Sequence, residues 1–440
     1  MTTRRFLFCA LLAANALAHI PTAVAQTFPR LGATLNGGNT TGLTAAHVAL
    51  LDVMTLGAYV GWKNSAGLTA SQLAAAAKLI NPSLRVFVYT DIMEDTSPPS
   101  ILAQNNSQIG SVPWWALTSW PGGSQVSTGG GRYAVNITTH TNALNGLNYP
   151  QWRANKDFGS FLSANPSVDG LYVDNVNTTP SVTADFAQSG SSQSPSTAGS
   201  SWRSGYVTYF GALRALSPAS QQLVIGNLAT WLVGNTITEY VTPAPVLNGG
   251  TMESVIGQSY SVETFAGWSG MMNYYAHVMT SVAAPQLVIF AQDAISTSDY
   301  QGFRYGFASC LLDNGYYYND DAGNYNDFMT YDEYSFNLGA PTAGPNNPNN
   351  GTYSSGGIAV YQNGVYRRDF ANGIALVNPK GNGTQTVTLE TSYKHLSGTQ
   401  VPAINNGQTV TTVTLNDRDG VILQRLTSQP IPDAPSLTVQ

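Results

Sequence analysis

Apolar and polar positions along the chain follow two different periods, and the change between them lies between residues 341 and 351. Before it, short continuous apolar runs of strand length alternate with longer segments of helical period. Continuous apolar runs are typical of strands buried on both faces, as in parallel sheets covered by helices. Beyond it, apolar residues recur at every second position between turns, which indicates antiparallel strands.

Eight apolar runs predict strands, and most are followed by a helical segment. The predicted strands are 30–38, 53–62, 85–94, 168–175, 222–227, 246–254, 286–293 and 315–320. Helices are expected over 43–51, 68–80, 149–165, 202–216, 263–282 and 300–312. Eight such units over roughly 300 residues suit a (β/α)8 TIM barrel. An open doubly wound sheet is disfavoured, because no Gly-rich phosphate loop follows the first strand.

The two patterns divide the chain into a large α/β domain and a small antiparallel β domain. We expect the catalytic barrel at 26–341, a Pro/Asn/Gly linker at 342–351, a sandwich-like β domain at 352–427 and a tail at 428–440. Residues 1–25 read as a signal peptide, with Arg4 and Arg5, a short apolar run, and Ala23-Val24-Ala25 before the cleavage point. The expected protein is therefore secreted or periplasmic, without membrane insertion.

Charge and composition exclude several classes of partner. Only 10% of the 440 residues are charged, and the mature chain would carry 16 basic and 24 acidic residues, a net charge of −8. Without basic clusters, nucleic acid and anionic membranes are poor partners. The histidines show no metal-ligand spacing, so no metal or other cofactor is expected. We expect a monomer.

Polar or aromatic side chains end nearly every predicted strand. In a TIM barrel these ends meet over one mouth, where catalysis takes place. Asp and Asn also favour loop starts and helix caps for structural reasons, but that explains nearly the whole set less well. Carboxylates, amides and aromatic rings together suit a neutral polyhydroxylated ligand. The candidate substrate-binding residues are Asn36, Trp62, Asp91, Trp115, Asn175, Asn227, Asp293 and Asp320.

Trp115 is the candidate that does not end a strand. It belongs to a long polar insertion at about residues 95–149, together with Trp114 and Trp120. These rings could form a sugar platform at the barrel mouth or a local core within the insertion. We favour the platform, because the insertion follows the third strand and should lie at the mouth.

Two carboxylates are candidates for glycoside hydrolysis, which needs one group to protonate the leaving oxygen and another to attack or to activate water. Asp174 ends the fourth strand and is the candidate nucleophile or base. Glu253 ends the sixth strand and is the candidate general acid, since burial readily raises the pKa of a glutamate. Asp169 precedes the fourth strand, at the opposite end of the barrel, and we interpret it as structural.

Three stretches resemble a known family. DGLYVDN at Asp169–Asn175, YDEYSFNLGAP at Tyr331–Pro341 and VYRRDFANGIALVNP at Val365–Pro379 resemble hypothetical glycosyl hydrolase family 15. The first is also similar to the strand-four motif of endo-α-1,4-polygalactosaminidases. The resemblance implies a TIM barrel and glycosidase activity. In related retaining barrels the strand-four Asp is the nucleophile and a strand-six carboxylate is the acid, which matches Asp174 and Glu253.

Two functions follow as hypotheses. The first is a secreted, retaining glycoside hydrolase that acts on an extracellular or cell-surface polysaccharide or its oligosaccharides. The second is a non-catalytic, lectin-like barrel that binds glycan. The two carboxylates discriminate between them, because a lectin has no need of a carboxyl pair across the scissile bond.

Overall fold

The computed structural model describes residues 27–35, 43–57, 62–96, 115–118, 124–129, 132–176, 195–227, 247–293, 296–320 and 327–426. The predicted signal peptide, the candidate residue Asn36, Trp114, Trp120 and the predicted tail at 428–440 lie outside these ranges. Among the helices in these ranges, none combines the length and the apolar character needed to cross a bilayer.

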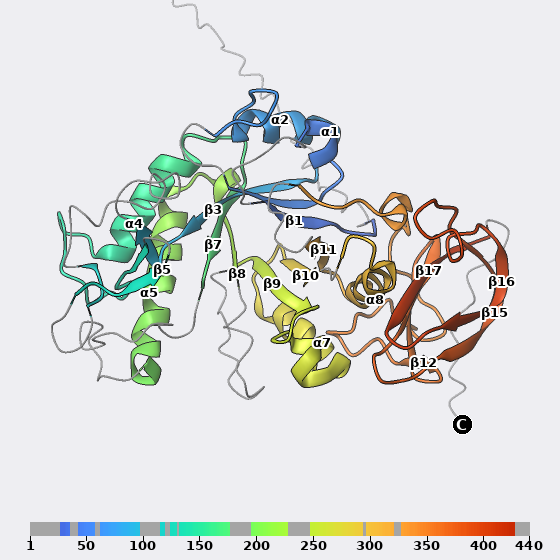
Figure 1. The fold of residues 1–440 in the computed structure, drawn as a ribbon. Helices are drawn as coiled ribbons and strands as arrows, with labels where there is room; N and C mark the ends of the chain where they lie inside the picture. Colours follow the sequence, from blue (N-terminus) through green and yellow to red (C-terminus); the bar gives the residue numbers. More distant parts are fainter. Residues whose placement is uncertain are drawn as a thin grey trace, which may run out of the picture.

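Eight parallel strands form the central sheet, which confirms the predicted barrel (Figure 1). The sheet closes between its first and last strands, where Leu31 and Tyr317 form a parallel bridge and Tyr317 N–H donates to Arg30 O at 2.9 Å. In sheet order the strands are β1 (Gly32–Leu35), β2 (Val53–Leu56), β3 (Arg85–Asp91), β7 (Gly170–Asp174), β8 (Leu223–Asn227), β9 (Gly249–Ile256), β10 (Leu287–Asp293) and β11 (Tyr316–Asp320).

Helices follow most strands and lie around the sheet (Figure 1). Two of them begin at capping boxes, in which the side chains of Thr69 and Gln72, and of Asn148 and Gln151, satisfy backbone N–H groups that the first turn leaves open. The helices are α1 (Ala45–Val48), α2 (Ala70–Ile80), α4 (Tyr149–Asp157, continued by a π-helical turn at Phe158–Leu162), α5 (Pro195–Leu216), α7 (Val262–Ser281) and α8 (Tyr300–Leu311).

Strand β9 extends from Gly249 to Ile256, whereas the sequence predicts a strand at 246–254. Its first residue, Gly249, has φ +153°, and a Cβ there would lie 2.1 Å from the backbone oxygen of Leu287 in β10. Glycine is therefore needed for the close approach of the two strands, although it weakens the strand pattern in the sequence. Glu253 is the one exposed residue of β9, whose other seven residues are buried.

A small antiparallel sheet follows β3, within the insertion that the sequence shows as a polar stretch. Its order is β4 (Glu94–Thr96), β6 (Arg132–Ala134) and β5 (Ser127–Gly129). Because it begins directly after the carboxyl end of β3, this sheet lies at the same end of the barrel as the candidate catalytic residues.

The C-terminal region forms a six-stranded antiparallel sheet, as the period-two pattern predicts. A 3-10 turn at Asp332–Ser335 precedes it, and the side chains of residues such as Val365, Leu376 and Leu423 form its own apolar core. In sheet order the strands are β12 (Val360–Gln362), β13 (Val365–Asp369), β14 (Gly373–Asn378), β17 (Asp419–Arg425), β15 (Gln385–His395) and β16 (Thr409–Leu415).

Helix α8 joins the barrel to this sheet. Its ten residues from Gly302 to Leu311 are all buried, whereas a helix at the surface buries only one face. On the sheet side, Arg304 forms an ion pair with Asp419 at 2.9 Å, and a Cβ on Gly420 would lie 2.5 Å from the backbone oxygen of Arg304. The backbones of α8 and β17 are therefore in direct contact.

Candidate active site

The carboxyl ends of the barrel strands surround a pocket of about 400 Å³. Four of the residues singled out in the sequence line it, namely Asp174, Asn227, Glu253 and Asp320. The full lining consists of Thr34, Tyr89, Arg132, Tyr172, Asp174, Asn227, Thr251, Glu253, Ala291, Tyr318 and Asp320. Two candidate catalytic carboxylates thus face one cavity, at the place where TIM barrels carry out catalysis.

Asp174 is the last residue of β7 and pairs in register with Asp91 of β3. One carboxylate oxygen, Oδ2, accepts a hydrogen bond from the Tyr89 hydroxyl at 2.6 Å. The other, Oδ1, accepts from the backbone N–H of Asn175 at 2.9 Å. Two neutral donors, one from the adjacent strand and one from the chain itself, therefore fix the direction of this carboxylate.

Glu253 lies at an irregularity of β9. Met252 pairs with Phe290 of β10 and Ile256 pairs with Gln292, so three residues of β9 oppose the single residue Ala291. Such a bulge bends a strand and redirects its side chains. The Glu253 carboxylate points into the pocket, where its Oε2 accepts a hydrogen bond from the Asn227 amide at 2.5 Å.

The surroundings of Glu253 raise the pKa of its carboxyl group above the ordinary value. Although the Glu253 side chain is exposed toward the pocket, the pocket walls displace water from around the carboxyl group, and this desolvation is the largest cause because it disfavours the charged form. The hydrogen bond from Asn227 opposes this, and the negative charges of Asp174, Asp293 and Asp320 add to it. A carboxyl group that stays protonated to higher pH is suited to donate a proton.

The pocket lining includes three tyrosines that are not among the candidates from the sequence. The rings of Tyr89 and Tyr172 stack with centroids 5.9 Å apart, and burial, followed by the charge of Asp174, raises the pKa of both hydroxyls well above its usual range. Tyr318 donates a long hydrogen bond of 3.4 Å to the backbone oxygen of Thr34. All three rings supply apolar faces, and the hydroxyls of Tyr89 and Tyr172 remain neutral donors.

A sequence signal for these tyrosines exists. Each lies two residues before the aspartate that ends its strand, in the segments Tyr89–Asp91, Tyr172–Asp174 and Tyr318–Asp320. Because side chains two apart in a strand share a face, a Tyr-x-Asp pattern at three strand ends indicates tyrosines beside the carboxylates. No comparable signal marks Arg132, which reaches the pocket from β6 of the insertion.

Three other candidates lie behind the pocket lining. Asp91 is 4% exposed, and its carboxylate accepts from the Asn175 side-chain amide at 2.8 Å. Asp293 is 8% exposed and accepts from the Ser254 hydroxyl at 2.9 Å. The structure therefore brings Asp91, Asn175 and Asp293 next to the catalytic candidates but does not place them on the pocket wall.

The two tryptophan candidates are buried. Trp62 is 4% exposed and belongs to the main apolar core. Trp115 is fully buried, packs against Tyr149 and Trp152, and donates its indole N–H to the backbone oxygen of Asn142 at 2.9 Å. Trp115 thus lies in the local core that was the alternative to a sugar platform, because the insertion needs an apolar centre of its own.

In the ranges that the structure describes, no group of three or more His, Cys, Asp or Glu side chains has the arrangement of a metal site. The three pocket carboxylates are Asp174, Glu253 and Asp320. The chemistry that this pocket can perform with its own residues is proton transfer and nucleophilic attack by carboxyl groups.

Residues 78–374 match the model of hypothetical glycosyl hydrolase family 15. A search of curated protein sequences finds no match. Among solved structures, an α-amylase from Anoxybacillus superimposes with a TM-score of 0.44 at 9% identity, over 88% of this chain and 89% of that chain. The glycoside hydrolase domain of PelA from Pseudomonas aeruginosa gives 0.40 at 10% identity, over 68% and 97%. A cycloalternan-degrading enzyme from Trueperella pyogenes gives 0.41 at 11% identity, over 92% and 61%.

Proposed function

Because this chain belongs to hypothetical glycosyl hydrolase family 15, we propose that it cleaves glycosidic bonds of an extracellular polysaccharide in the pocket at the barrel mouth. The family match confirms the resemblance seen in the three sequence stretches. The observation that carries the proposal is the presence of Asp174 and Glu253 on the wall of one cavity. Such a carboxyl pair is what glycoside hydrolysis requires.

In the proposed reaction, Glu253 is the general acid and Asp174 the nucleophile. Glu253 gives its proton to the glycosidic oxygen while Asp174 attacks the anomeric carbon, so that the sugar becomes an ester of Asp174. Water then attacks the ester, Glu253 takes the proton from that water, and the sugar leaves with its anomeric configuration retained. The raised pKa of Glu253 supports its first role, and the two hydrogen bonds that orient Asp174 support the attack.

The lining of the pocket suits a sugar ring with free hydroxyl groups. Tyrosine rings can cover the apolar face of a sugar. Asn227 and Asp320 can bond pairs of hydroxyls, since amides and carboxylates present two polar atoms each. Arg132 is the one Lys or Arg among the described lining residues.

We further propose that the protein is exported, on the strength of residues 1–25. N-terminal sequencing of protein recovered from the culture medium or the periplasm should begin at Gln26. A chain that still carries Met1, or a lipid on Cys9, would show that the segment is not a cleaved secretory signal.

The function is tested by incubating the purified protein with bacterial exopolysaccharides and plant glycans and measuring the reducing ends released. Proton NMR of the first product formed then shows whether the anomeric configuration is retained or inverted. Hydrolysis that disappears in Asp174→Asn supports the proposal. Binding of a glycan without any release of reducing ends would instead favour the lectin-like function.

A further inference from the structure

Each candidate catalytic carboxylate is followed by a residue in an unfavourable backbone conformation. Asn175 follows Asp174 and has φ +52°, and Ser254 follows Glu253 and also has φ +52°. Residues with a Cβ rarely adopt this left-handed region, and serine gains less there than asparagine. The other described non-glycine residues with positive φ lie in turns or bends, away from the pocket lining.

The side chains of both left-handed residues are anchored in the same way. The Asn175 amide donates to Asp91 at 2.8 Å, and the Ser254 hydroxyl donates to Asp293 at 2.9 Å. Each of these aspartates is the buried last residue of an adjacent strand, β3 beside β7 and β10 beside β9. The same arrangement of carboxylate, left-handed residue and anchoring aspartate therefore occurs twice.

The two arrangements mirror one another across β8. In the sheet order β3-β7-β8-β9-β10, the anchoring aspartates lie on the outer strands, the candidate catalytic carboxylates lie inside them, and Asn227 lies on the strand between. We propose that Asp91 and Asp293 are positioning residues, which hold the backbone after Asp174 and Glu253 and so aim both carboxylates into the pocket. The proposal rests on the proposed function for the roles of those two carboxylates.

The anchors are themselves held in place. The second oxygen of Asp91 accepts from the backbone N–H of Met93 at 2.8 Å. On the other side, Gly257 has φ +111°, and a Cβ there would lie 2.1 Å from the backbone oxygen of Asp293. The chain that leaves β9 therefore lies directly against Asp293. A rigid anchor is required if it is to impose a strained conformation on its neighbour.

The consequence of losing an anchor is largest for Glu253. Its place within a three-residue bulge depends on Ser254, because a return of Ser254 to extended backbone would change the face on which nearby side chains point. A misplacement of about 1 Å at a catalytic group can lower the rate about 100-fold. The anchor therefore acts on the rate through geometry, without touching the substrate.

Asp293 has a second effect that can be separated from the first. Its negative charge raises the pKa of Glu253, after burial and together with Asp174 of β7 and Asp320 of β11. The other charged group in the pocket lining is Arg132 of β6, and Asn227 of β8 donates the opposing hydrogen bond. Asp293→Asn removes the charge and keeps an acceptor for Ser254. Ser254→Gly keeps the charge, removes the hydroxyl and allows a left-handed backbone at no cost.

The first test needs no substrate, because the chain contains only six glutamates. Protein labelled with ¹³C at the glutamate carboxyl gives few signals, and comparison with Glu253→Gln assigns the one that belongs to Glu253. We expect its pKa to fall in Asp293→Asn, since a facing negative charge is gone. An unmoved titration of Glu253 in Asp293→Asn would overturn the assignment of Asp293.

The second test separates positioning from stability. On the glycan found in the screen, Ser254→Gly and Asn175→Gly should lower kcat about 10- to 100-fold with KM changed less than about twofold. The matched control is Asn363→Gly, which also removes a left-handed side chain and its hydrogen bond, to Thr386 at 2.8 Å, but in the C-terminal sheet. It should keep both kcat and the Glu253 titration.

Two further outcomes, both from the second test, would overturn the proposal. One is wild-type kcat, within about twofold, in both Ser254→Gly and Asn175→Gly. The other is a loss of activity that follows the fall in Tm equally in Ser254→Gly and Asn363→Gly, which would show a purely structural role. If the wild-type protein hydrolyses no glycan, the proposed function fails, while the titration of Glu253 still decides whether Asp293 acts on it.

Discussion

Glu253 at the barrel mouth and Glu390 in the C-terminal sheet show how one residue type is driven in opposite directions within one molecule. For both glutamates burial is the largest single influence, and taken alone it would raise the pKa of the carboxyl group. At the mouth, three aspartates raise the pKa of Glu253 further, against a single amide donor. In the sheet, the hydrogen bonds and charge of Arg367, with a hydrogen bond from Tyr393, lower the pKa of Glu390 to about 2.

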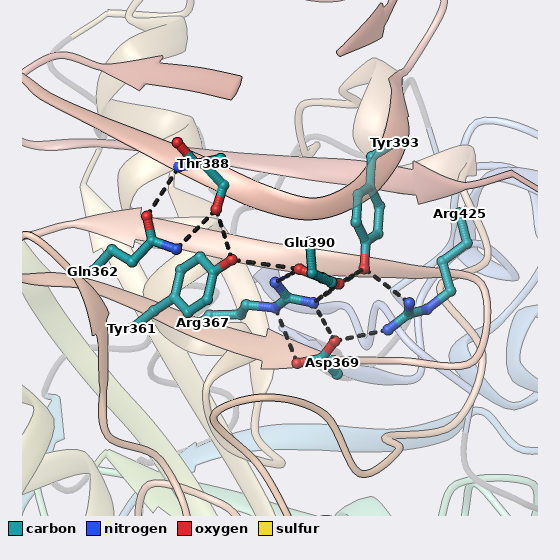
Figure 2. A network of polar contacts seen from close by, with 8 residues as sticks. All are labelled: Tyr361, Gln362, Arg367, Asp369, Thr388, Glu390, Tyr393 and Arg425. Atoms are coloured by element: carbon teal, nitrogen blue, oxygen red, sulfur yellow. Dashed lines mark hydrogen bonds and ion pairs between the residues drawn. The ribbon is translucent and has the colours of Figure 1, made fainter. Parts of the chain in front are cut away.

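The contacts explain the difference. Figure 2 shows Arg367 between Asp369 and Glu390, with its guanidinium 2.7 Å from the first carboxylate and 2.6 Å from the second. Arg425 adds a second cation at 2.7 Å from Asp369. Within the described part of the chain, the donors to Asp174 and Glu253 are instead neutral: a tyrosine hydroxyl, a backbone N–H and an amide. A neutral donor orients a carboxylate and leaves its negative charge in place, whereas a cation orients the carboxylate and also neutralises its charge.

The largest expected effect comes from removing the charge of Asp174 at the barrel mouth. Asp174→Asn keeps the shape of the side chain, so the fold and glycan binding should persist, while kcat falls about 10⁴-fold or more because no nucleophile remains. Initial rates on the glycan found in the screen measure the loss, and circular dichroism checks the fold. Turnover near the wild-type rate would place the catalytic pair elsewhere, and an unfolded variant would make Asp174 a structural residue.

Replacing the proposed acid should have the next largest effect. Glu253→Gln cannot protonate the leaving oxygen, so kcat should fall about 10²- to 10⁴-fold. An aryl glycoside with a good leaving group needs little protonation and should recover part of the rate. Equal losses on the natural glycan and on the aryl glycoside would argue against Glu253 as the acid.

In the sheet, removing the central cation should reduce stability and leave chemistry unchanged. Arg367→Met leaves the buried Asp369 and the more exposed Glu390 short of a cation, and the loss at Asp369 should lower the free energy of unfolding by about 3–5 kcal/mol. Urea unfolding measures this, and kcat per folded molecule should stay constant. The control is Arg85→Met, because the Arg85 side chain is 46% exposed and its ion pair with Asp169 should contribute less than about 1 kcal/mol. Equal losses in the two variants would contradict this view of the network.

The smallest effects should appear in the pH dependence of stability, with opposite signs for the two glutamates. The lowered pKa of Glu390 stabilises the folded state above the unfolded pKa of glutamate, so the advantage of the wild type over Glu390→Gln should vanish as pH falls toward 2. The raised pKa of Glu253 works in reverse, and the wild type should lose stability relative to Glu253→Gln as pH rises through that pKa. Urea midpoints at a series of pH values measure both trends, and parallel trends would refute the comparison.

The segment DGLYVDN illustrates how far the sequence leads. Its apolar centre predicts a buried strand, and the strand direction places its two acids at opposite ends of the barrel. The structure confirms the structural interpretation of Asp169. Its carboxylate forms ion pairs with Lys78 at 2.7 Å and Arg85 at 3.0 Å, at the end of the strand opposite to the mouth. Periodicity sufficed here because burial on both faces leaves no other pattern for a central parallel strand.

Other features depend on contacts that periodicity does not contain. The bulge that directs Glu253 is set by the register of β9 against β10, and the burial of Trp115 by how the insertion packs on Tyr149 and Trp152. The roles of Asp91 and Asp293 were out of reach for the same reason, since a strand-end aspartate looks alike in sequence whether it faces a pocket or a neighbouring turn.

Helix α8 makes the barrel and the C-terminal sheet depend on each other for folding. All ten residues from Gly302 to Leu311 are buried, so water would contact side chains that are now covered if the C-terminal sheet were absent. A recombinant fragment that stopped at residue 341 would leave the buried Arg304 without Asp419 and would expose Ala308, which now meets Gly420. The sheet therefore cannot be exchanged freely for the accessory domain of another barrel. The barrel and the sheet have to be expressed and redesigned together.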